Sequence, residues 1–149
     1  MSETSQMPPV LSSSVKGPLG VAHLPRLWLK ILLHASGRLP EGYRHGVGGF
    51  DEFLTTTLGI DRDAFVAYIE TEKPDYLTLE RWVRDHATSL DDEAIAKVNH
   101  RVGTVNMNDE LLAERRARLG LDPSITGAVA VNDIDDWKAF HTMLTSPSS

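Results

Sequence analysis

The residues best suited to chemistry lie on one helix-forming segment and on the loop that follows it. Arg26 and Lys30 are four positions apart, which places both side chains on one side of a helix. The glycine-rich segment 37–49 comes next and carries three further candidates, Tyr43, Arg44 and His45. If this loop folds back over the helix, cations, a phenol and an imidazole can line one pocket for a polar or anionic small molecule.

The predicted roles follow from the chemistry of these side chains. An arginine clamps an anion, and a histidine exchanges protons near neutral pH. The predicted ligand-binding residues are His23, Arg26, Lys30 and Arg44, and the predicted catalytic residues are Tyr43 and His45. The alternative is that Arg26 and Lys30 only solvate the exposed side of their helix, because charged stripes usually face water, while Tyr43 covers the edge of the core.

Other kinds of site lack their sequence patterns. The six histidines include no H-E-x-x-H pair, and the chain has no cysteine, so thiolate metal ligands and cysteine nucleophiles are excluded. There is no G-x-S-x-G motif, and the glycines of the loop match neither the P-loop nor the dinucleotide-binding pattern. We therefore expect no metal site and no cofactor.

Length and charge narrow the choice of partners. A chain of 149 residues with 41% hydrophobic residues is the size of one domain with a real core. Its formal charge of -6 opposes binding to nucleic acid. The longest apolar run, residues 27–33, contains Lys30 and is too short to span a membrane, and the N-terminus lacks the features of a secretory signal. We expect a soluble, cytoplasmic protein.

Apolar spacing predicts an all-α fold, a compact single-domain bundle of about six to seven short helices with disordered tails. The predicted helical domain covers residues 20–144, between flexible tails at 1–19 and 145–149 that should carry no chemistry. Pro25 and Gly37 mark the ends of the first helix, and Asn108 and Gly120 those of the sixth. The predicted helices cover 24–35, 50–58, 62–72, 76–87, a segment from the Ser89 capping box to 105, 108–119, and a last one after Asn132-Asp133.

Polar and aromatic residues of the later helices have two interpretations each. The acidic residues Asp133, Asp135 and Asp136 could bind a cation, but we expect them to favour the dipole at the start of the last helix. Asn99 or His100 should project inward, to serve either a structural network or a site. Core packing is expected for all three tryptophans, Trp28, Trp82 and Trp137.

Several segments, taken in order, resemble a bacterial family known as domain of unknown function 5069. They are His23–Arg26, Gly42–Leu54, Leu58–Asp61, Asp75–Leu77, Arg81–Val83 and Asn132–Trp137. The resemblance spans roughly residues 23–141 and implies a compact, mostly helical domain, but it transfers no catalytic residue. Where the family commonly has an acidic residue before the lysine at position 30, this chain has Leu29.

The leading functional hypothesis is binding of a small molecule, with cofactor-independent catalysis as an extension, between the first helix and the loop. The rival is a noncatalytic interaction module, in which a second copy or another protein covers the apolar first helix. A homodimer is its simplest form.

Overall fold

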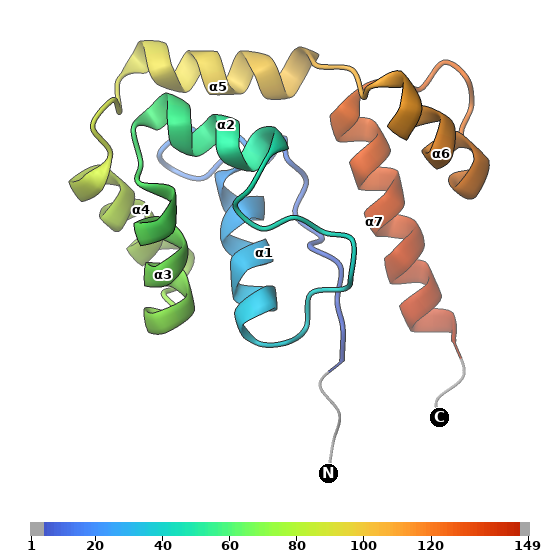
Figure 1. The fold of residues 1–149 in the computed structure, drawn as a ribbon, viewed down its shortest axis with the longest axis horizontal. Coiled ribbons are helices and arrows are strands. Elements are labelled where there is room, and N and C mark those ends of the chain that lie inside the picture. Colours follow the sequence, from blue (N-terminus) through green and yellow to red (C-terminus); the bar gives the residue numbers. More distant parts are fainter. Residues whose placement is uncertain (1–4, 147–149) are drawn as a thin grey trace.

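The structure is a computed structural model that describes residues 5–146 and contains seven helices in that range (Figure 1). The predicted all-α fold is confirmed, because only two isolated β-bridges occur among the described residues. The parts of the predicted tails at residues 1–4 and 147–149 lie outside them. The helices are α1 (Leu24–Ala35), α2 (Gly49–Leu58), α3 (Arg62–Glu72), α4 (Tyr76–His86), α5 (Asp92–Thr104), α6 (Asp109–Leu119) and α7 (Ala128–Thr145).

Local capping explains where most helices begin. The side chains of Asp61, Asp75 and Asn108 accept hydrogen bonds from amides in the first turns of α3, α4 and α6. The cap of α5 is Asp91, which accepts from the Ala94 amide, so the prediction of a cap at Ser89 was wrong. Asp91 directly precedes the first residue of α5, which is the N-cap position, whereas Ser89 lies two residues further from the helix.

The apolar core surrounds α1. Leu24, Leu27 and Ile31 are fully buried, and α1 packs against α3 and α4 while α2 packs against α5. In Figure 1, α5 runs along the top of the molecule with α2 beneath it. The apolar face of α1 is therefore covered within the chain, and the rival hypothesis loses the surface on which it was based.

The segment before α1 packs more closely than its composition predicts. Pro8, Pro9 and Ser13 are buried, and the Met7 amide donates to the Arg38 carbonyl. This differs from the predicted flexible tail, because main-chain carbonyls of the segment serve as acceptors for a buried side chain of α1. Composition does not report such contacts. No helix of the described residues is long and apolar enough to cross a membrane.

The last helix differs most from its prediction. It begins at Ala128, so the acidic residues at 133, 135 and 136 lie inside the helix, and the prediction that they favour its start was wrong. Asp136 is instead buried and faces α1. Trp28 and Trp82 pack against the core, but Trp137 is 62% exposed, so the expectation of core packing was wrong for Trp137.

Candidate functional site

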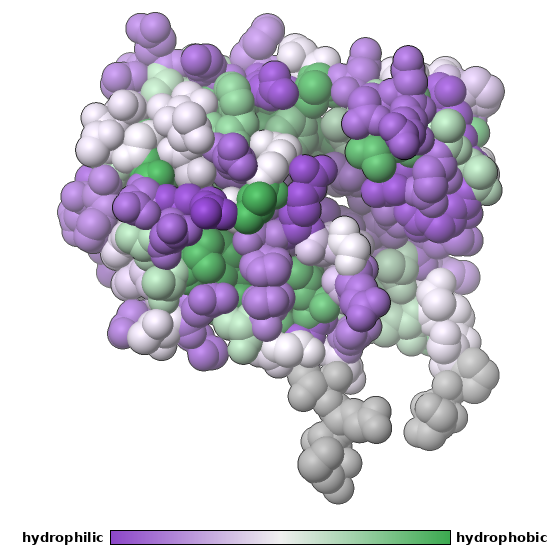
Figure 2. Space-filling view, in the orientation of Figure 1, coloured by the Kyte–Doolittle hydropathy of each residue, from purple (hydrophilic) through white to green (hydrophobic). Residues whose placement is uncertain are grey.

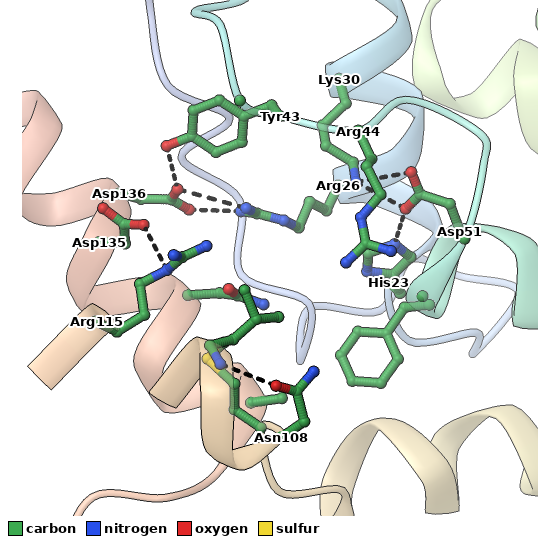
Figure 3. A pocket seen from close by; sticks show the side chains of 18 of the residues that line it. His23, Arg26, Lys30, Tyr43, Arg44, Asp51, Asn108, Arg115, Asp135 and Asp136 are labelled. Atoms are coloured by element: carbon green, nitrogen blue, oxygen red, sulfur yellow. Dashed lines mark hydrogen bonds and ion pairs between the residues drawn. The ribbon is translucent and has the colours of Figure 1, made fainter. Parts of the chain in front are cut away.

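A pocket of about 630 Å³ lies between α1 with its following loop on one side and α6 and α7 on the other. A hollow is visible in this part of the surface in Figure 2, and Figure 3 shows side chains from the two sides facing each other across the space. Five of the six predicted site residues line it: His23, Arg26, Lys30, Tyr43 and Arg44. The sixth, His45, is not among its lining residues.

The first part of the pocket wall is a buried cluster around Asp51, in the first turn of α2. Lys30 Nζ donates to both carboxylate oxygens of Asp51, at 2.7 and 2.8 Å, and the Gly46 amide donates to Oδ2 at 2.8 Å. His23 Nε2 lies 2.6 Å from Oδ1 of the same carboxylate. The cluster thus ties the glycine-rich loop and α2 to α1.

The charges of this cluster follow from burial and pairing. Although burial by itself would raise the pKa of Asp51, the hydrogen bond with His23 and the charge of Lys30 lower that pKa to about 2. Burial lowers the pKa of His23 and of Lys30, and outweighs the attraction of Asp51 in both cases. A neutral imidazole suits the geometry, because Nε2–H can donate to Asp51 while Nδ1 accepts from the Ser13 hydroxyl at 2.9 Å.

The order Ser13, His23, Asp51 has the connectivity of a nucleophilic triad, and sequence reasoning missed it by assigning Ser13 to a tail. Two observations argue against such a role. The Ser13 side chain is buried, at 1% exposure, and it does not line the pocket. A nucleophile must reach its substrate, so this chain of hydrogen bonds anchors the N-terminal segment to α1.

The second part of the wall is a buried ion pair between α1 and α7. Arg26 Nη1 donates to Asp136 Oδ2 at 2.5 Å and to the carbonyls of Pro9 and Leu11 at 2.6 and 2.9 Å. The Tyr43 hydroxyl donates to Asp136 Oδ1 at 2.9 Å. Arg26 and Lys30 are 4% and 7% exposed, so the alternative in which they only solvate the helix was wrong.

Burial also sets the titration of Tyr43 and Asp136. Burial and the charge of Asp136 raise the pKa of Tyr43 well above its usual range. The pKa of Asp136 is raised by burial, which outweighs its pairing with Arg26. Tyr43 is therefore a hydrogen-bond donor across the physiological pH range and does not serve as a base.

The opposite wall holds further ion pairs on α6 and α7. Arg118 donates to both oxygens of Asp135, at 2.9 and 3.0 Å, and to Glu114 at 2.8 Å. Arg115 Nε lies 3.4 Å from Asp135 Oδ2 and the side chain also pairs with Glu114. Each cation named so far in the pocket thus has at least one carboxylate partner.

Arg44 differs from these cations. Within residues 5–146 it makes no ion pair with a carboxylate, and its side chain projects from the loop into the space beside His23 and Asp51 (Figure 3). A Cβ added at Gly48 or Gly49 would lie 2.7 or 3.3 Å from its Nη1, so these glycines leave room for the guanidinium. Arg101, also in the lining, lies over the Phe53 ring at 4.9 Å without a carboxylate partner in the described range.

The resulting charge of the pocket opposes that of the whole chain. Its lining contains six arginine or lysine side chains and five carboxylates, whereas the chain as a whole carries a formal charge of -6. The lining of the pocket therefore has a formal surplus of one positive charge in an otherwise acidic protein. Among the described residues, Arg44 and Arg101 have no carboxylate partner and Glu41 has no cationic partner, which leaves this surplus of one.

His45 lies in a different environment from the one predicted for it. Its ring stacks on His34 with centroids 3.6 Å apart, and its buried Nδ1 has no hydrogen-bond partner among the described residues. Burial, and then the neighbouring charge of His34, lower its pKa. The loop carries Tyr43 and Arg44 to the pocket and His45 to the last turn of α1, beside His34.

Asn99 projects inward, accepts from the Ala22 amide at 2.8 Å and donates to the Gly20 carbonyl at 2.9 Å, so its role is structural. In the described part of the chain, no group of three or more His, Cys, Asp or Glu side chains is arranged to hold a metal ion.

Comparison with known proteins identifies the family of this chain. The family described as Domain of unknown function (DUF5069) matches residues 10–138, which is most of the chain. The protein belongs to this family. A comparison with curated proteins gave no match. Membership therefore agrees with the resemblance noted in the sequence, and it brings no activity with it.

Proposed function

We propose that this DUF5069 protein binds a small anionic molecule in the pocket between α1 and α6–α7. The observation that carries the proposal is the position of Arg44, a cation that reaches into the pocket and has no carboxylate partner in residues 5–146. A guanidinium presents several N–H donors in a plane, which suits a carboxylate or phosphate group. Arg101 adds a second cation to the lining that has no carboxylate partner in the described range.

The buried pairs support binding by fixing the walls around Arg44. Asp51 is held by Lys30, His23 and the Gly46 amide, and it fixes the start of α2 next to the glycines that admit the Arg44 side chain. A site whose supporting groups are already hydrogen-bonded loses less entropy when its ligand binds. Lys30 and Arg26 therefore have a structural role, and Arg44 forms the ion pair with the ligand.

Binding is proposed rather than catalysis because the two predicted catalytic residues do not act together. The raised pKa of Tyr43 keeps its hydroxyl protonated, and that proton is donated to Asp136, so Tyr43 cannot act as a base. His45 stacks on His34 outside the lining of the pocket. An acid–base reaction would need a group near its own pKa in contact with the ligand.

The direct test is thermal unfolding with acetate, citrate and inorganic phosphate at constant ionic strength. A ligand at a hundred times its dissociation constant stabilises the native state by about 2.7 kcal/mol, so at least one of these anions should raise the melting temperature of the wild type saturably. Arg44→Gln should lose the response, and Arg84→Gln, at an exposed arginine of α4, should keep it. Equal responses of both variants, or none in the wild type, would refute the proposal.

A second candidate is the homodimer, now through α7 instead of α1. Trp137 and Leu144 are seven residues apart on α7 and are 62% and 68% exposed, which is unusual for large apolar side chains on one face. Light scattering over a range of protein concentrations tests it. A dimer that Trp137→Gln dissociates would support this candidate, whereas a monomer at every concentration would exclude it.

A further inference from the structure

We propose that the ligand is an amphipathic organic anion, with its charged group at Arg44 and an aliphatic chain against the facing wall formed by Val105, Met107 and Leu111. The inference rests on the proposed function and names the chemical class of its ligand. It follows from the unequal chemistry of the two sides of the pocket. One side is cationic and polar, whereas the other, besides the ion pairs of α6 and α7, presents Val105, Met107 and Leu111, interspersed with Asn106 and Asn108.

The polar side is built by α1, the glycine-rich loop and the start of α2. It contributes His23, Arg26, Lys30, Arg44 and Asp51 to the lining. Four of these five are committed to one another or to Asp136, at distances between 2.5 and 2.8 Å. Arg44 alone remains to pair with a charged group, so the site fits one anionic head on this side.

The apolar residues of the facing wall lie at the connection between α5 and α6. Val105 caps the end of α5, Met107 follows in the connection, and Leu111 lies in the first turn of α6. The Met107 amide donates to the Thr126 carbonyl at 2.9 Å and the Ala128 amide to the Val105 carbonyl at 3.0 Å, so the backbone here is fixed. All three side chains are half-buried and line the pocket.

Contact between this apolar wall and water is unfavourable in free energy. Half-buried apolar side chains that face a cavity keep water in contact with apolar surface, and a ligand that displaces this water gains free energy in proportion to the apolar area covered. An inorganic anion at Arg44 would leave the wall wet. An aliphatic chain that extends from the anionic group would cover it.

The volume also favours an organic ligand. Pockets for organic small molecules typically measure about 300–1,000 Å³, and this one measures about 630 Å³. Phe50 lines the same space, with its ring edge-on to His23 at 5.4 Å between centroids. The pocket therefore provides a cationic end, an aromatic side and an apolar end.

The test is isothermal titration calorimetry with acetate, butanoate, hexanoate and octanoate at constant pH and ionic strength. Each buried methylene should tighten binding by about three- to fourfold until the wall is covered. Hexanamide, which lacks the charge, should bind at least tenfold more weakly than hexanoate. Arg44→Gln should weaken every acid of the series by a common factor.

Variants of the wall separate this inference from nonspecific binding. Met107→Gln, close in size but polar, should reduce the gain per methylene, and Leu111→Asn should do the same in a second position. Leu77→Gln, at a leucine of α4 that is 53% exposed, is the matched control and should leave the series unchanged. Circular dichroism verifies that each variant is folded.

The outcomes distinguish the two proposals. If acetate binds through Arg44 but affinity does not rise with chain length, the amphipathic ligand is refuted and anion binding stands. If affinity rises equally in Met107→Gln, Leu111→Asn and the wild type, the chain does not contact this wall and the inference is again refuted. If no member of the series or inorganic anion binds, both proposals fail.

Discussion

The bundle α1–α5 and the pair α6–α7 are held by different forces. Fifteen buried apolar residues of one core cluster all lie between Val21 and Val102, whereas the buried apolar residues of α6 and α7 are Leu112 and Val131. Besides the packing of Val129 against the core, polar contacts attach α7 to the bundle, from Arg26 and Tyr43 to Asp136 and from Ser12 to Asp133. Close apolar packing leaves no space, so the pocket lies at the polar junction.

The largest effect is expected inside the bundle, at Asp51. Asp51→Asn leaves the Lys30 ammonium buried without a countercharge, which should lower the free energy of unfolding by about 3–5 kcal/mol. Urea unfolding measures the change. The double variant Asp51→Asn with Lys30→Met should recover most of it, and a single variant within about 1 kcal/mol of the wild type would show that the pair supports nothing.

The equivalent substitution at the junction should have a smaller and more local effect. Asp136→Asn leaves Arg26 with the carbonyls of Pro9 and Leu11 as acceptors, so we expect a loss of about 1–3 kcal/mol. Amide hydrogen exchange should accelerate in α7 while α1 stays protected. Uniform acceleration in both helices would mean that the two regions unfold as one unit, and the comparison would fail.

Acid should weaken the bundle through His23. Its pKa in the folded protein lies below the ordinary 6.5, so its contribution to stability is complete above pH 6.5 and is lost as the pH falls through the folded value. Asp51, Lys30 and Arg26 are the charges that act on it. His23→Gln should flatten the dependence of unfolding free energy on pH between 7 and 5, and an unchanged slope would contradict the neutral imidazole. Because the pKa of Asp51 is lowered to about 2, Asp51 causes a second loss of stability only as the pH falls from about 4 toward 2.

The smallest effect is expected on the exposed face of α6. Arg118 and Glu114 form a solvent-exposed pair, and such pairs contribute about 0–1 kcal/mol. Glu114→Gln should change the free energy of unfolding by no more than that, as measured in urea. A loss comparable to that of Asp136→Asn would show that α6 depends on its ion pairs more than this comparison allows.

The fold was predictable where the capping residues and the apolar spacing of a helix are visible in its own sequence. Asn108 and Gly120 mark both ends of α6, and the apolar spacing of residues 24–35 reproduces α1. The start of α7 was not predictable in this way, because Ala128–Val131 contains no capping side chain and its residues also suit a strand.

The site was predictable only in part, for a related reason. The spacing of Arg26 and Lys30 identifies a charged stripe, but their burial depends on Asp136 and Asp51, which are 110 and 21 residues away. In the N-terminal segment Arg26 donates to main-chain carbonyls, and amino-acid composition does not predict such contacts. Arg44 and His45 are adjacent in the loop, yet Arg44 lines the pocket and His45 stacks on His34, a difference that the sequence does not indicate.

The central claim, that an anion binds at Arg44, is tested most directly by the guanidinium Nε–H resonances in a ¹H–¹⁵N spectrum titrated with hexanoate at constant ionic strength. The account predicts a saturable shift of the Arg44 resonance, with a single dissociation constant that agrees with calorimetry, while Arg84 stays unchanged. Equal, linear shifts of all exposed arginines, or an Arg44 resonance that does not move, would contradict it.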